Sequence, residues 1–334
     1  MKKFITKILL AVLVFVAIVI GYFSIGSAPS AEEISWGVNF SQKQAKYLGL
    51  DWQEVYSALI DDLGARKIKI ITHWDLIESQ EGEYDFADLD WQIEKAGKEG
   101  VEILLVIGIK TGRWPECHEP YWVQDQKSNL KKPTIRTQQK LLDYLERIVS
   151  RYKNSPAVLA WQVENEPFFP FGKCSIEKDL LKKEINLVKS LDPERPIIIS
   201  DSGEFSLWIT AAKLGNIVST TLHRRVWFEE IKTYITYPLR PVFYWKKSQI
   251  IKNFFDKEVI CGELQAEPWC SEGISDCGLE EQGKTMDPEK FKENIEFAKK
   301  TGLKEFYLWG AEWWYWMKEK QGQPEIWQEA KKLF

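Results

Sequence analysis

Short runs of β-branched and apolar residues alternate along this chain with longer amphipathic stretches. Parallel strands joined by crossover helices are the usual outcome of such alternation. Eight strands of this kind over about 300 residues match one closed barrel. We therefore expect an α/β fold, a single (β/α)8 TIM barrel. The predicted strands are 34–40, 67–74, 101–109, 157–166, 196–201, 217–224, 259–263 and 305–310.

Segments with helical periodicity separate most of these strands. They are 52–63, 88–98, 137–152, 176–190, 247–255 and 288–301. Asp88 and Ser175 are candidate N-caps, since short polar side chains accept hydrogen bonds from free amides at helix starts. Residues 227–245 form an aromatic-rich insertion after the sixth strand. No linker or repeat indicates a second domain, so residues 32–334 should fold as one unit.

The amino terminus has the pattern of a membrane anchor. Lys2, Lys3 and Lys7 precede an uncharged apolar stretch over residues 8–25. Roughly 20 apolar residues suffice to cross a bilayer, and Pro29 disfavours cleavage nearby. We expect residues 1–31 to be an uncleaved signal-anchor, a transmembrane helix with a short linker. A cleaved signal and secretion is the alternative.

Topology follows from the position of the lysines. Because basic residues stay on the cytoplasmic side, the large carboxyl-terminal part should lie outside the cytoplasm, on a single-pass cell-membrane protein in contact with lipid. Nucleic acid is excluded as a partner because the net charge is −4 and the basic residues are dispersed. We expect a monomer.

Cysteine and tryptophan usage adds two expectations. Cys117 and Cys174 follow the third and fourth strands, which are barrel neighbours and could be bridged, and Cys270 could pair with Cys277. Cys261 lies inside an apolar strand and should be a buried thiol. No pair of Cys-x-x-Cys units is present, so no metal is expected. The chain holds 16 Trp. We expect about half in the core and others lining a cleft.

Carboxylates stand where two apolar strands end. The run 161–167, Trp-Gln-Val-Glu-Asn-Glu-Pro, places Glu166 after the fourth strand, and the run 258–269 places Glu263 at the end of the seventh. The carboxyl ends of barrel strands form the face that carries active sites. Two carboxyls there favour acid/base chemistry. Glu164 and Glu267 are the competing candidates.

These motifs resemble the retaining glycoside hydrolases of clan A. The resemblance rests on Asn165-Glu166-Pro167, on Glu263 after Ile260-Cys-Gly, and on Trp309 at the end of the eighth strand. Residues 73–86 resemble the loop after the second strand in the cellulase-like, family 5-like and β-galactosidase-like branches. The resemblance implies a catalytic barrel that hydrolyses β-O-glycosidic bonds of an oligo- or polysaccharide by double displacement, without a metal or organic cofactor.

The same resemblance implies roles for individual residues. Glu166 corresponds to the acid/base, Glu263 to the nucleophile, Asn165 to a ligand of the sugar 2-hydroxyl and Trp309 to an apolar floor beneath the sugar. The clan commonly has an arginine on the second strand, where this chain has Lys69. Further candidate substrate contacts, with core packing as the alternative for several, are His73, Trp74, Trp114, His223 and Trp269. One of Tyr234, Tyr237 and Tyr244 is expected to support the nucleophile. Trp122, Trp313 and Trp314 are further stacking candidates, with core or lid packing the default for at least two of the exit-loop tryptophans.

Two other functions fit the same residues. A transglycosylase would use both carboxyls but exclude water from the second step. An inactive barrel that binds cell-surface glycans belongs to a different class and predicts sugar binding without turnover. Sugar, linkage and exo or endo action depend on loop contacts that the sequence pattern does not define.

Overall fold

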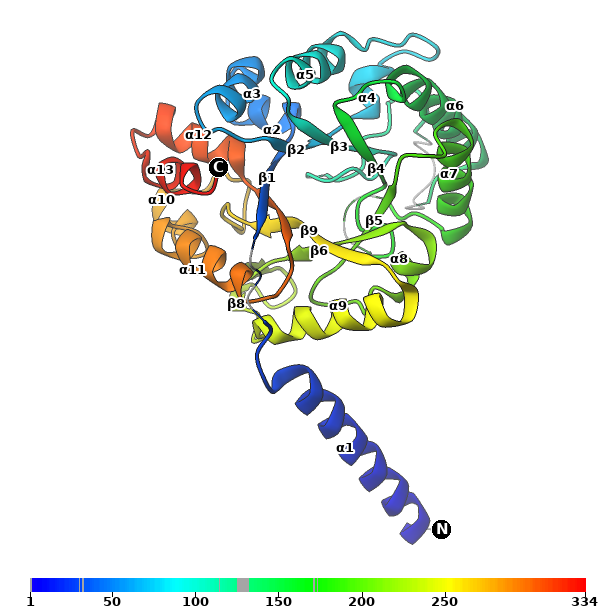
Figure 1. Ribbon diagram of the computed structural model, residues 1–334, viewed down its shortest axis with the longest axis vertical. Coiled ribbons are helices and arrows are strands. Elements are labelled where there is room, and N and C mark those ends of the chain that lie inside the picture. The colour runs from blue at the N-terminus through cyan, green and yellow to red at the C-terminus, as the bar shows by residue number, and fades with distance from the viewer. Residues whose placement is uncertain are drawn as a thin grey trace.

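The computed structural model describes residues 2–29, 31, 33–113, 115–124, 132–170, 172 and 174–334. Eight parallel strands close into a barrel in the order β1, β2, β3, β4, β5, β6, β9 and β10, seen end-on in Figure 1. They coincide with the eight predicted runs, so the predicted barrel is confirmed. The strands are β1 (Ser35–Phe40), β2 (Lys67–Ile71), β3 (Glu102–Ile107), β4 (Val158–Val163), β5 (Ile197–Asp201), β6 (Ile217–Leu222), β9 (Glu258–Gln265) and β10 (Glu305–Trp309).

Helices surround the barrel, and a short hairpin follows β6. The predicted aromatic-rich insertion contains this hairpin, β7 (Arg225–Phe228) with β8 (Thr233–Thr236). The helices are α2 (Gln42–Tyr47), α3 (Trp52–Asp61), α4 (Trp74–Ile77), α5 (Ala87–Lys98), α6 (Ile135–Tyr152), α7 (Lys178–Leu191), α8 (Ile209–Leu214), α9 (Pro241–Phe255), α10 (Leu279–Gln282), α11 (Pro288–Lys299), α12 (Ala311–Lys320) and α13 (Glu325–Lys331).

Both predicted N-caps are wrong by two residues. Helix α5 begins at Ala87, whose amide donates to Asp85 Oδ1 at 2.9 Å, so Asp88 lies inside the first turn. Helix α7 begins three residues after Ser175, with Glu177 at its N-cap position. In each case the chain turns into the helix at a residue whose side chain makes no cap, and the sequence pattern gives no signal for this.

The barrel interior changes from apolar to polar along its strands. Its apolar layer includes Ala160 of β4 and Ile198 of β5. Side chains on one face of a strand recur every second residue. Two residues further along, the buried side chains are Gln162 and Ser200. The carboxyl end of the barrel therefore has a polar interior, whereas a second apolar core fills the space between the strands and the helices.

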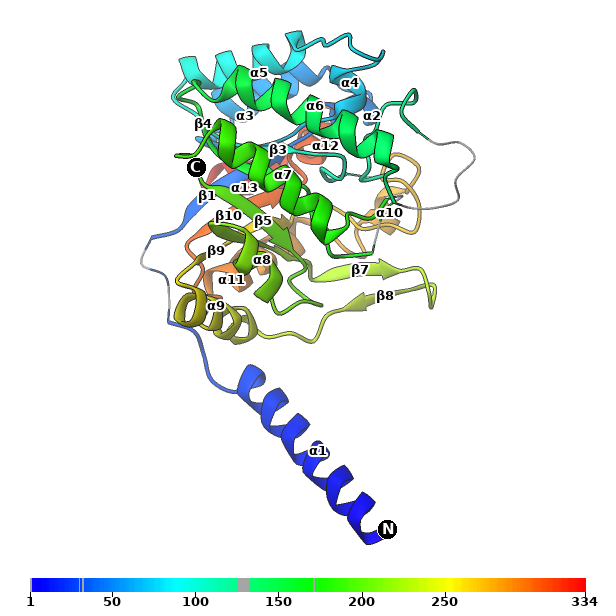
Figure 2. The same ribbon diagram turned by 90° about the vertical axis from the view of Figure 1, so that its right-hand side faces the viewer.

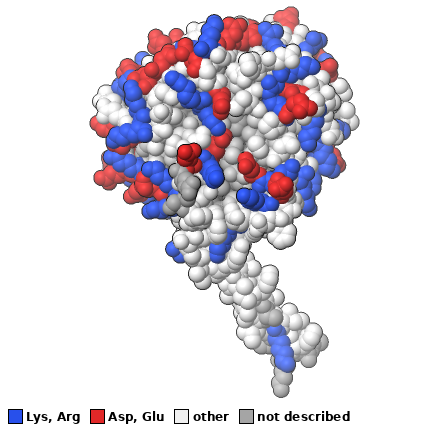
Figure 3. Space-filling view, in the orientation of Figure 1, with Lys and Arg blue, Asp and Glu red and all other residues white. Residues whose placement is uncertain are grey.

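Helix α1 (Lys2–Ser24) projects away from the barrel in Figures 1 and 2. Residues 7–24 are long and apolar enough to cross a membrane, although a signal sequence shares these properties. Figure 3 shows almost no charge along this helix, in contrast to the mixed acidic and basic surface of the barrel. Figure 2 shows β7–β8 and α10 at one end of the barrel. The segment that enters β1 lies at the opposite end.

The carboxyl end of α1 is bound to helix α9. Arg240 donates to the carbonyl of Ser24 at 2.7 Å, and Lys246 donates to that of Ile25 at 2.9 Å. The rings of Phe23 and Phe243 pack 5.5 Å apart. The last carbonyls of a helix lack partners within it and favour nearby positive charge. Arg240 at the start of α9 and Lys246 within it thus place two cations at the carboxyl end of α1.

Both predicted disulfides are present in the structure. Cys117–Cys174 joins the exit loops of β3 and β4, and Cys270–Cys277 closes a small loop after β9. Cys261 is a buried free thiol, as predicted. The first disulfide ties together two loops at the polar end of the barrel.

Removing Cys117–Cys174 should destabilise the protein more than removing Cys270–Cys277, since the bridged residues are 57 and 7 apart. In the chain-entropy account these separations correspond to about 4 and about 2 kcal/mol of unfolding free energy. Urea unfolding of the Cys117→Ser/Cys174→Ser and Cys270→Ser/Cys277→Ser variants measures both losses. Equal losses would contradict the entropic ranking.

Candidate active site

Glu263 reaches the barrel interior because β9 contains one extra residue. Residues 220–221 of β6 are consecutive, yet they pair with Cys261 and Glu263, leaving Gly262 without a partner. Ile260 belongs to the apolar layer inside the barrel, so regular alternation would turn residue 263 outward. A bulge re-aims the side chains that follow it. The bulge at Gly262 therefore directs the carboxylate inward.

Lys69 of β2 is the basic partner of Glu263. Its Nζ lies 3.0 Å from Glu263 Oε1, and the lysine side chain is fully buried. Gly262 leaves room for it: a Cβ at this glycine would collide with Ser219 Oγ and lie 3.7 Å from Lys69 Nζ. An ammonium this close stabilises the negative charge of the carboxylate. Lysine thus reaches the carboxylate that the clan's arginine would support.

Strand β4 ends in a backbone turn that contains two glutamates. Glu164 and Glu166 have positive φ angles of 59° and 40°, which cost about 1–3 kcal/mol each outside glycine. Hydrogen bonds hold the turn in place. The amide of Glu166 donates to Ser200 Oγ at 2.7 Å, and the amide of Asn165 donates to the carbonyl of Lys110. Neighbouring loops thus determine where each carboxyl points.

Glu166 is buried beside Glu263. Its Oε1 accepts a hydrogen bond from Thr221 Oγ1 at 3.3 Å, and Thr221 pairs with Glu263 across the β6–β9 ladder. Burial raises the pKa of the Glu166 carboxyl well above its usual value, and the charges of Glu263 and Glu116 raise it further. Charges act this strongly only at short range. The two predicted carboxyls therefore lie in one site.

Glu164 points away from this site, into the protein. Its two carboxylate oxygens accept hydrogen bonds from the amides of Ile109 and Lys110, at 2.9 and 2.6 Å. Burial raises the pKa of Glu164 to about 7, and that of the neighbouring Glu184 on α7 well above its usual value. Adjacent buried carboxyls cannot both ionise cheaply, so each disfavours ionisation of the other. Glu164 therefore fastens the loop after β3 to β4 and α7.

Asn165 and Trp309 lie close together, as predicted for residues of one site. Asn165 Oδ1 accepts hydrogen bonds from Gln162 at 2.9 Å and Ser200 at 3.3 Å. Its Nδ2 has no hydrogen-bond partner among the described residues. A Cβ on Gly112 would lie 3.6 Å from this Nδ2 and 3.4 Å from the Trp309 ring. The amide nitrogen and the indole therefore flank the same glycine.

Arg113 gathers two further carboxylates beside Trp309. Its guanidinium pairs with Glu267 and, at 2.7 Å, with Glu312, and all three side chains are buried. The guanidinium carbon lies 4.1 Å from the centre of the Trp309 ring, within cation–π range. One face of the predicted sugar floor thus carries an arginine. The competing candidate Glu267 is held by this arginine.

His73 and Trp74 follow β2 but occupy different environments. His73 Nε2 lies 3.0 Å from Ser41 Oγ, and its ring packs edge-on against His118 with centroids 4.4 Å apart. Burial lowers the pKa of both histidines, that of His118 to about 4. Trp74 is fully buried and donates to Glu78 at 2.7 Å. The predicted substrate contact of Trp74 is therefore wrong, because its indole has no exposed surface.

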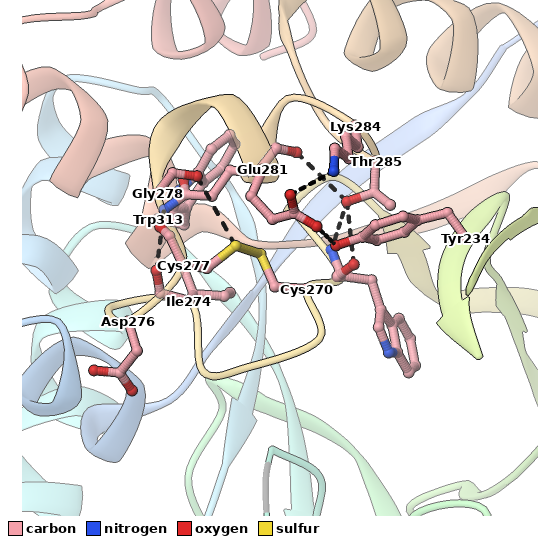
Figure 4. Close-up of a disulfide and its surroundings, with 12 residues drawn as sticks. Tyr234, Cys270, Ile274, Asp276, Cys277, Gly278, Glu281, Lys284, Thr285 and Trp313 are labelled. Atoms are coloured by element: carbon pink, nitrogen blue, oxygen red, sulfur yellow. Dashed lines mark hydrogen bonds and ion pairs between the residues drawn. A yellow bond between two sulfur atoms is a disulfide. The ribbon is translucent and has the colours of Figure 1, made fainter. Parts of the chain in front are cut away.

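His223 and Trp269 meet after β6 and β9. Their ring centroids are 4.9 Å apart, and Trp269 is 43% exposed. Figure 4 shows the loop that carries Trp269, closed by Cys270–Cys277. The amide of Trp269 donates to Thr285 Oγ1 at 2.9 Å. A disulfide and a hydrogen-bonded loop thus hold an exposed indole in position.

The three tyrosines considered as partners of the nucleophile occupy different places. Tyr234 of β8 donates to Glu281 of α10, beside the loop shown in Figure 4. Tyr244 is buried and donates to Glu204 at 3.0 Å. Burial, then the charges of Glu204 and Glu166, raises the pKa of Tyr237 to about 12, so Tyr237 lies near the acid candidate. In the described part of the chain none of the three donates to the carboxylate on β9.

The other tryptophan candidates occupy different environments. Trp313 and Trp314 are buried, so core packing, the default expected for at least two of the exit-loop tryptophans, is the outcome for this pair. Trp122 is partly buried and donates to the carbonyl of Glu78 at 2.9 Å. Trp114 lies outside the described residues. Among these tryptophans, Trp313 and Trp314 pack in the core.

Several side chains around the two carboxyls were missed from the sequence. Lys110 is fully buried, and its ammonium donates to the carbonyls of Glu166 and Phe169 at 3.0 and 2.8 Å. The position of four of the missed residues in the sequence could have indicated a site. They lie in the exit loop of β3, which leaves the same end of the barrel as the loop that carries Glu166. The missed residues are Lys110, Arg113, Glu116, His118, Glu204 and Thr221. Among all residues that the structure describes, no three His, Cys, Asp or Glu side chains gather as a metal site requires.

Comparison with known proteins points to one class. The family model described as beta-galactosidase, of glycoside hydrolase family 42, matches residues 51–180. Probable mannan endo-1,4-beta-mannosidase A of Aspergillus niger is 38% identical over 60 residues, covering 18% of this chain and 16% of that protein. Beta-galactosidase BbgII of Bifidobacterium bifidum is 31% identical over 107 residues, covering 29% and 16%. The chain thus matches only 16% of the length of either relative.

Solved structures include proteins with a similar fold. The GH5_18 protein of Bifidobacterium longum subsp. longum superposes with a TM-score of 0.62 at 13% identity, over 90% of this chain and 79% of that one. The chain is similar to glycoside hydrolases of clan A. The predicted resemblance, including its β-galactosidase-like part, is therefore confirmed. At such low identity the structural match shows the barrel fold alone.

The paired carboxyls of Glu164 and Glu184 should make stability depend on pH. Both pKa values are raised in the folded protein, so it holds protons that the unfolded chain releases above its ordinary glutamate pKa. Stability is then lost as pH rises toward about 7 and beyond. Glu184→Gln should reduce this loss by about 1–3 kcal/mol between pH 5 and 8.

Urea unfolding at both pH values measures the effect. Glu194→Gln, which neutralises an exposed carboxyl, is the control and should leave the pH dependence as in the parent. A Glu184→Gln variant that loses as much stability as the parent over this range would show that the raised pKa of Glu184 does not contribute to the pH dependence.

Proposed function

We propose that this protein is a retaining glycosidase that hydrolyses β-O-glycosidic bonds of an oligo- or polysaccharide. The observation that supports this most is a pair of carboxyls in opposed environments. Burial and nearby negative charge raise the pKa of Glu166 well above its usual value, whereas Glu263 is paired with the buried Lys69. A pair of this kind supplies one acid and one anionic nucleophile. The similarity to β-galactosidases and mannan mannosidases agrees with a carbohydrate substrate.

In the first step Glu263 attacks the anomeric carbon while Glu166 gives its proton to the departing oxygen. The glycosidic C–O bond breaks and a glycosyl ester forms on Glu263. Esterification removes the negative charge of Glu263, which had helped to keep Glu166 protonated. The pKa of Glu166 should then fall, which suits its next role.

In the second step Glu166 acts as a base. It takes a proton from water, the water oxygen attacks the anomeric carbon, and the ester bond to Glu263 breaks with overall retention. Asn165 Nδ2 would donate to the sugar 2-hydroxyl, and Trp309 would lie beneath the ring. His73, His223 and Trp269 are proposed as outer sugar contacts. The same residues serve a transglycosylase if a sugar replaces the water.

We further propose that residues 1–31 form a membrane anchor with a short linker and that residues 32–334 are the catalytic domain outside the cytoplasm. The uncharged helix α1 supports an anchor. Two disulfides agree with an oxidising compartment. Secretion after cleavage is the alternative.

A substrate screen of the full-length protein in detergent tests the proposal. Aryl β-glucosides, β-galactosides and β-mannosides and the matching polymers should reveal turnover on some substrate. Glu166→Ala and Glu263→Ala should each lower kcat/KM by about 10²-fold or more, whereas Glu194→Gln should not. Azide should restore turnover of activated substrates by Glu166→Ala, with retained configuration. A folded parent that binds sugar without any turnover would favour the inactive glycan-binding barrel.

The alkaline limb of the pH profile should report Glu166. Activity needs its proton, so kcat/KM should fall as pH rises through its raised pKa. Glu116 contributes to that raised pKa, and Glu116→Gln removes the contribution. The limb should move to lower pH by up to about one unit. A limb that stays in place or moves to higher pH would argue against Glu166 as the titrating acid.

A further inference from the structure

Three aromatic side chains form a small stack at the carboxyl end of the barrel. Phe169 follows β4, Phe205 follows β5 and Tyr237 follows β8. The rings of Phe169 and Phe205 are nearly parallel, with an interplanar angle of 14° and centroids 5.6 Å apart. Tyr237 packs edge-on against Phe205, also at 5.6 Å. We call these three residues the aromatic shelf.

The shelf adjoins Glu166. The amide of Phe169 donates to the carbonyl of Glu166 at 3.0 Å. The second shelf ring directly follows Glu204, which accepts a hydrogen bond from Thr221 Oγ1, the same hydroxyl that contacts the Glu166 carboxyl, each at 3.3 Å. The third ring, Tyr237, lies within the electrostatic influence of Glu166. All three rings thus lie on the acid/base side.

The shelf is rigid at its base and open at its top. The carbonyl of Phe169 accepts a hydrogen bond from the buried ammonium of Lys110 at 2.8 Å. Phe205 nevertheless remains 57% exposed. A large apolar ring that is fixed by stacking yet open to solvent gains free energy when another apolar face covers it. Pyranose rings present such a face.

We propose that the aromatic shelf is the leaving-group subsite and binds the pyranose that departs from the broken bond. This inference rests on the proposed function. The acid gives its proton to the leaving oxygen, so the departing group must lie on the side of Glu166, where the shelf is. The substrate class is therefore a saccharide with sugars on both sides of the bond, rather than a glycoside with a small leaving group.

Glycosyl fluorides separate the two sides of the bond, because fluoride leaves as a single atom and does not reach the shelf. The probes are the β-fluorides of glucose, galactose and mannose and the β-1,4-linked disaccharides of the same sugars. Phe205→Ala should lower kcat/KM on the disaccharide at least tenfold and change it less than twofold on the fluoride. Phe205→Tyr should restore the disaccharide rate.

Leu207→Ala is the matched control, since Leu207 is equally exposed, at 57%, two residues along the same loop. It should leave both rates unchanged. Three outcomes would show that the shelf is not a leaving-group subsite while the glycosidase proposal stands. Phe205→Ala could leave disaccharide turnover within twofold of the parent, or it could lower the disaccharide and fluoride rates equally. The third outcome is a parent that cleaves fluorides but no disaccharide. A folded parent that turns over no fluoride, no disaccharide and none of the matching polymers overturns both proposals.

Discussion

The ion pair between Lys69 and Glu263 is the interaction on which the geometry of the candidate site depends. A buried ammonium without a partner costs several kcal/mol, and here the carboxylate lies 3.0 Å from it. The pair exists only because the bulge at Gly262 turns Glu263 inward. The same glycine leaves the space that the lysine occupies. The β-bulge, the absent side chain of Gly262 and the Lys69–Glu263 ion pair thus depend on one another.

Two glutamates of similar burial, separated by one residue, have different surroundings. Glu164 accepts two backbone hydrogen bonds and neighbours the buried Glu184, so its raised pKa belongs to a structural pair. Glu166 faces the charge of Glu263 inside the barrel. A perturbed pKa alone would not have told them apart. The directions set by two left-handed backbone conformations do.

Periodicity and strand-end position were enough to predict the eight strands and both disulfides. They also located Glu166 and Glu263, because parallel strands bring their carboxyl ends together whatever the loops do. The burial of Trp74, Trp313 and Trp314 could not be decided from the sequence, because an indole after a strand fits a core as well as a cleft. Lys110 and Arg113 were missed because the contacts that tie them to the site are to residues more than fifty positions away. No local pattern encodes such contacts.

The carboxyl end of α1 is bound to the barrel rather than attached through a loose tether. Arg240 and Lys246 hold its terminal carbonyls, and Gly302 lets Ala28 and Pro29 approach closely. If α1 spans a bilayer, protein contacts rather than linker length set the height and tilt of the barrel above the lipid. The mouth of the barrel would then stay within a narrow range of heights above the membrane. It would reach only saccharides that lie along the membrane or diffuse into that range.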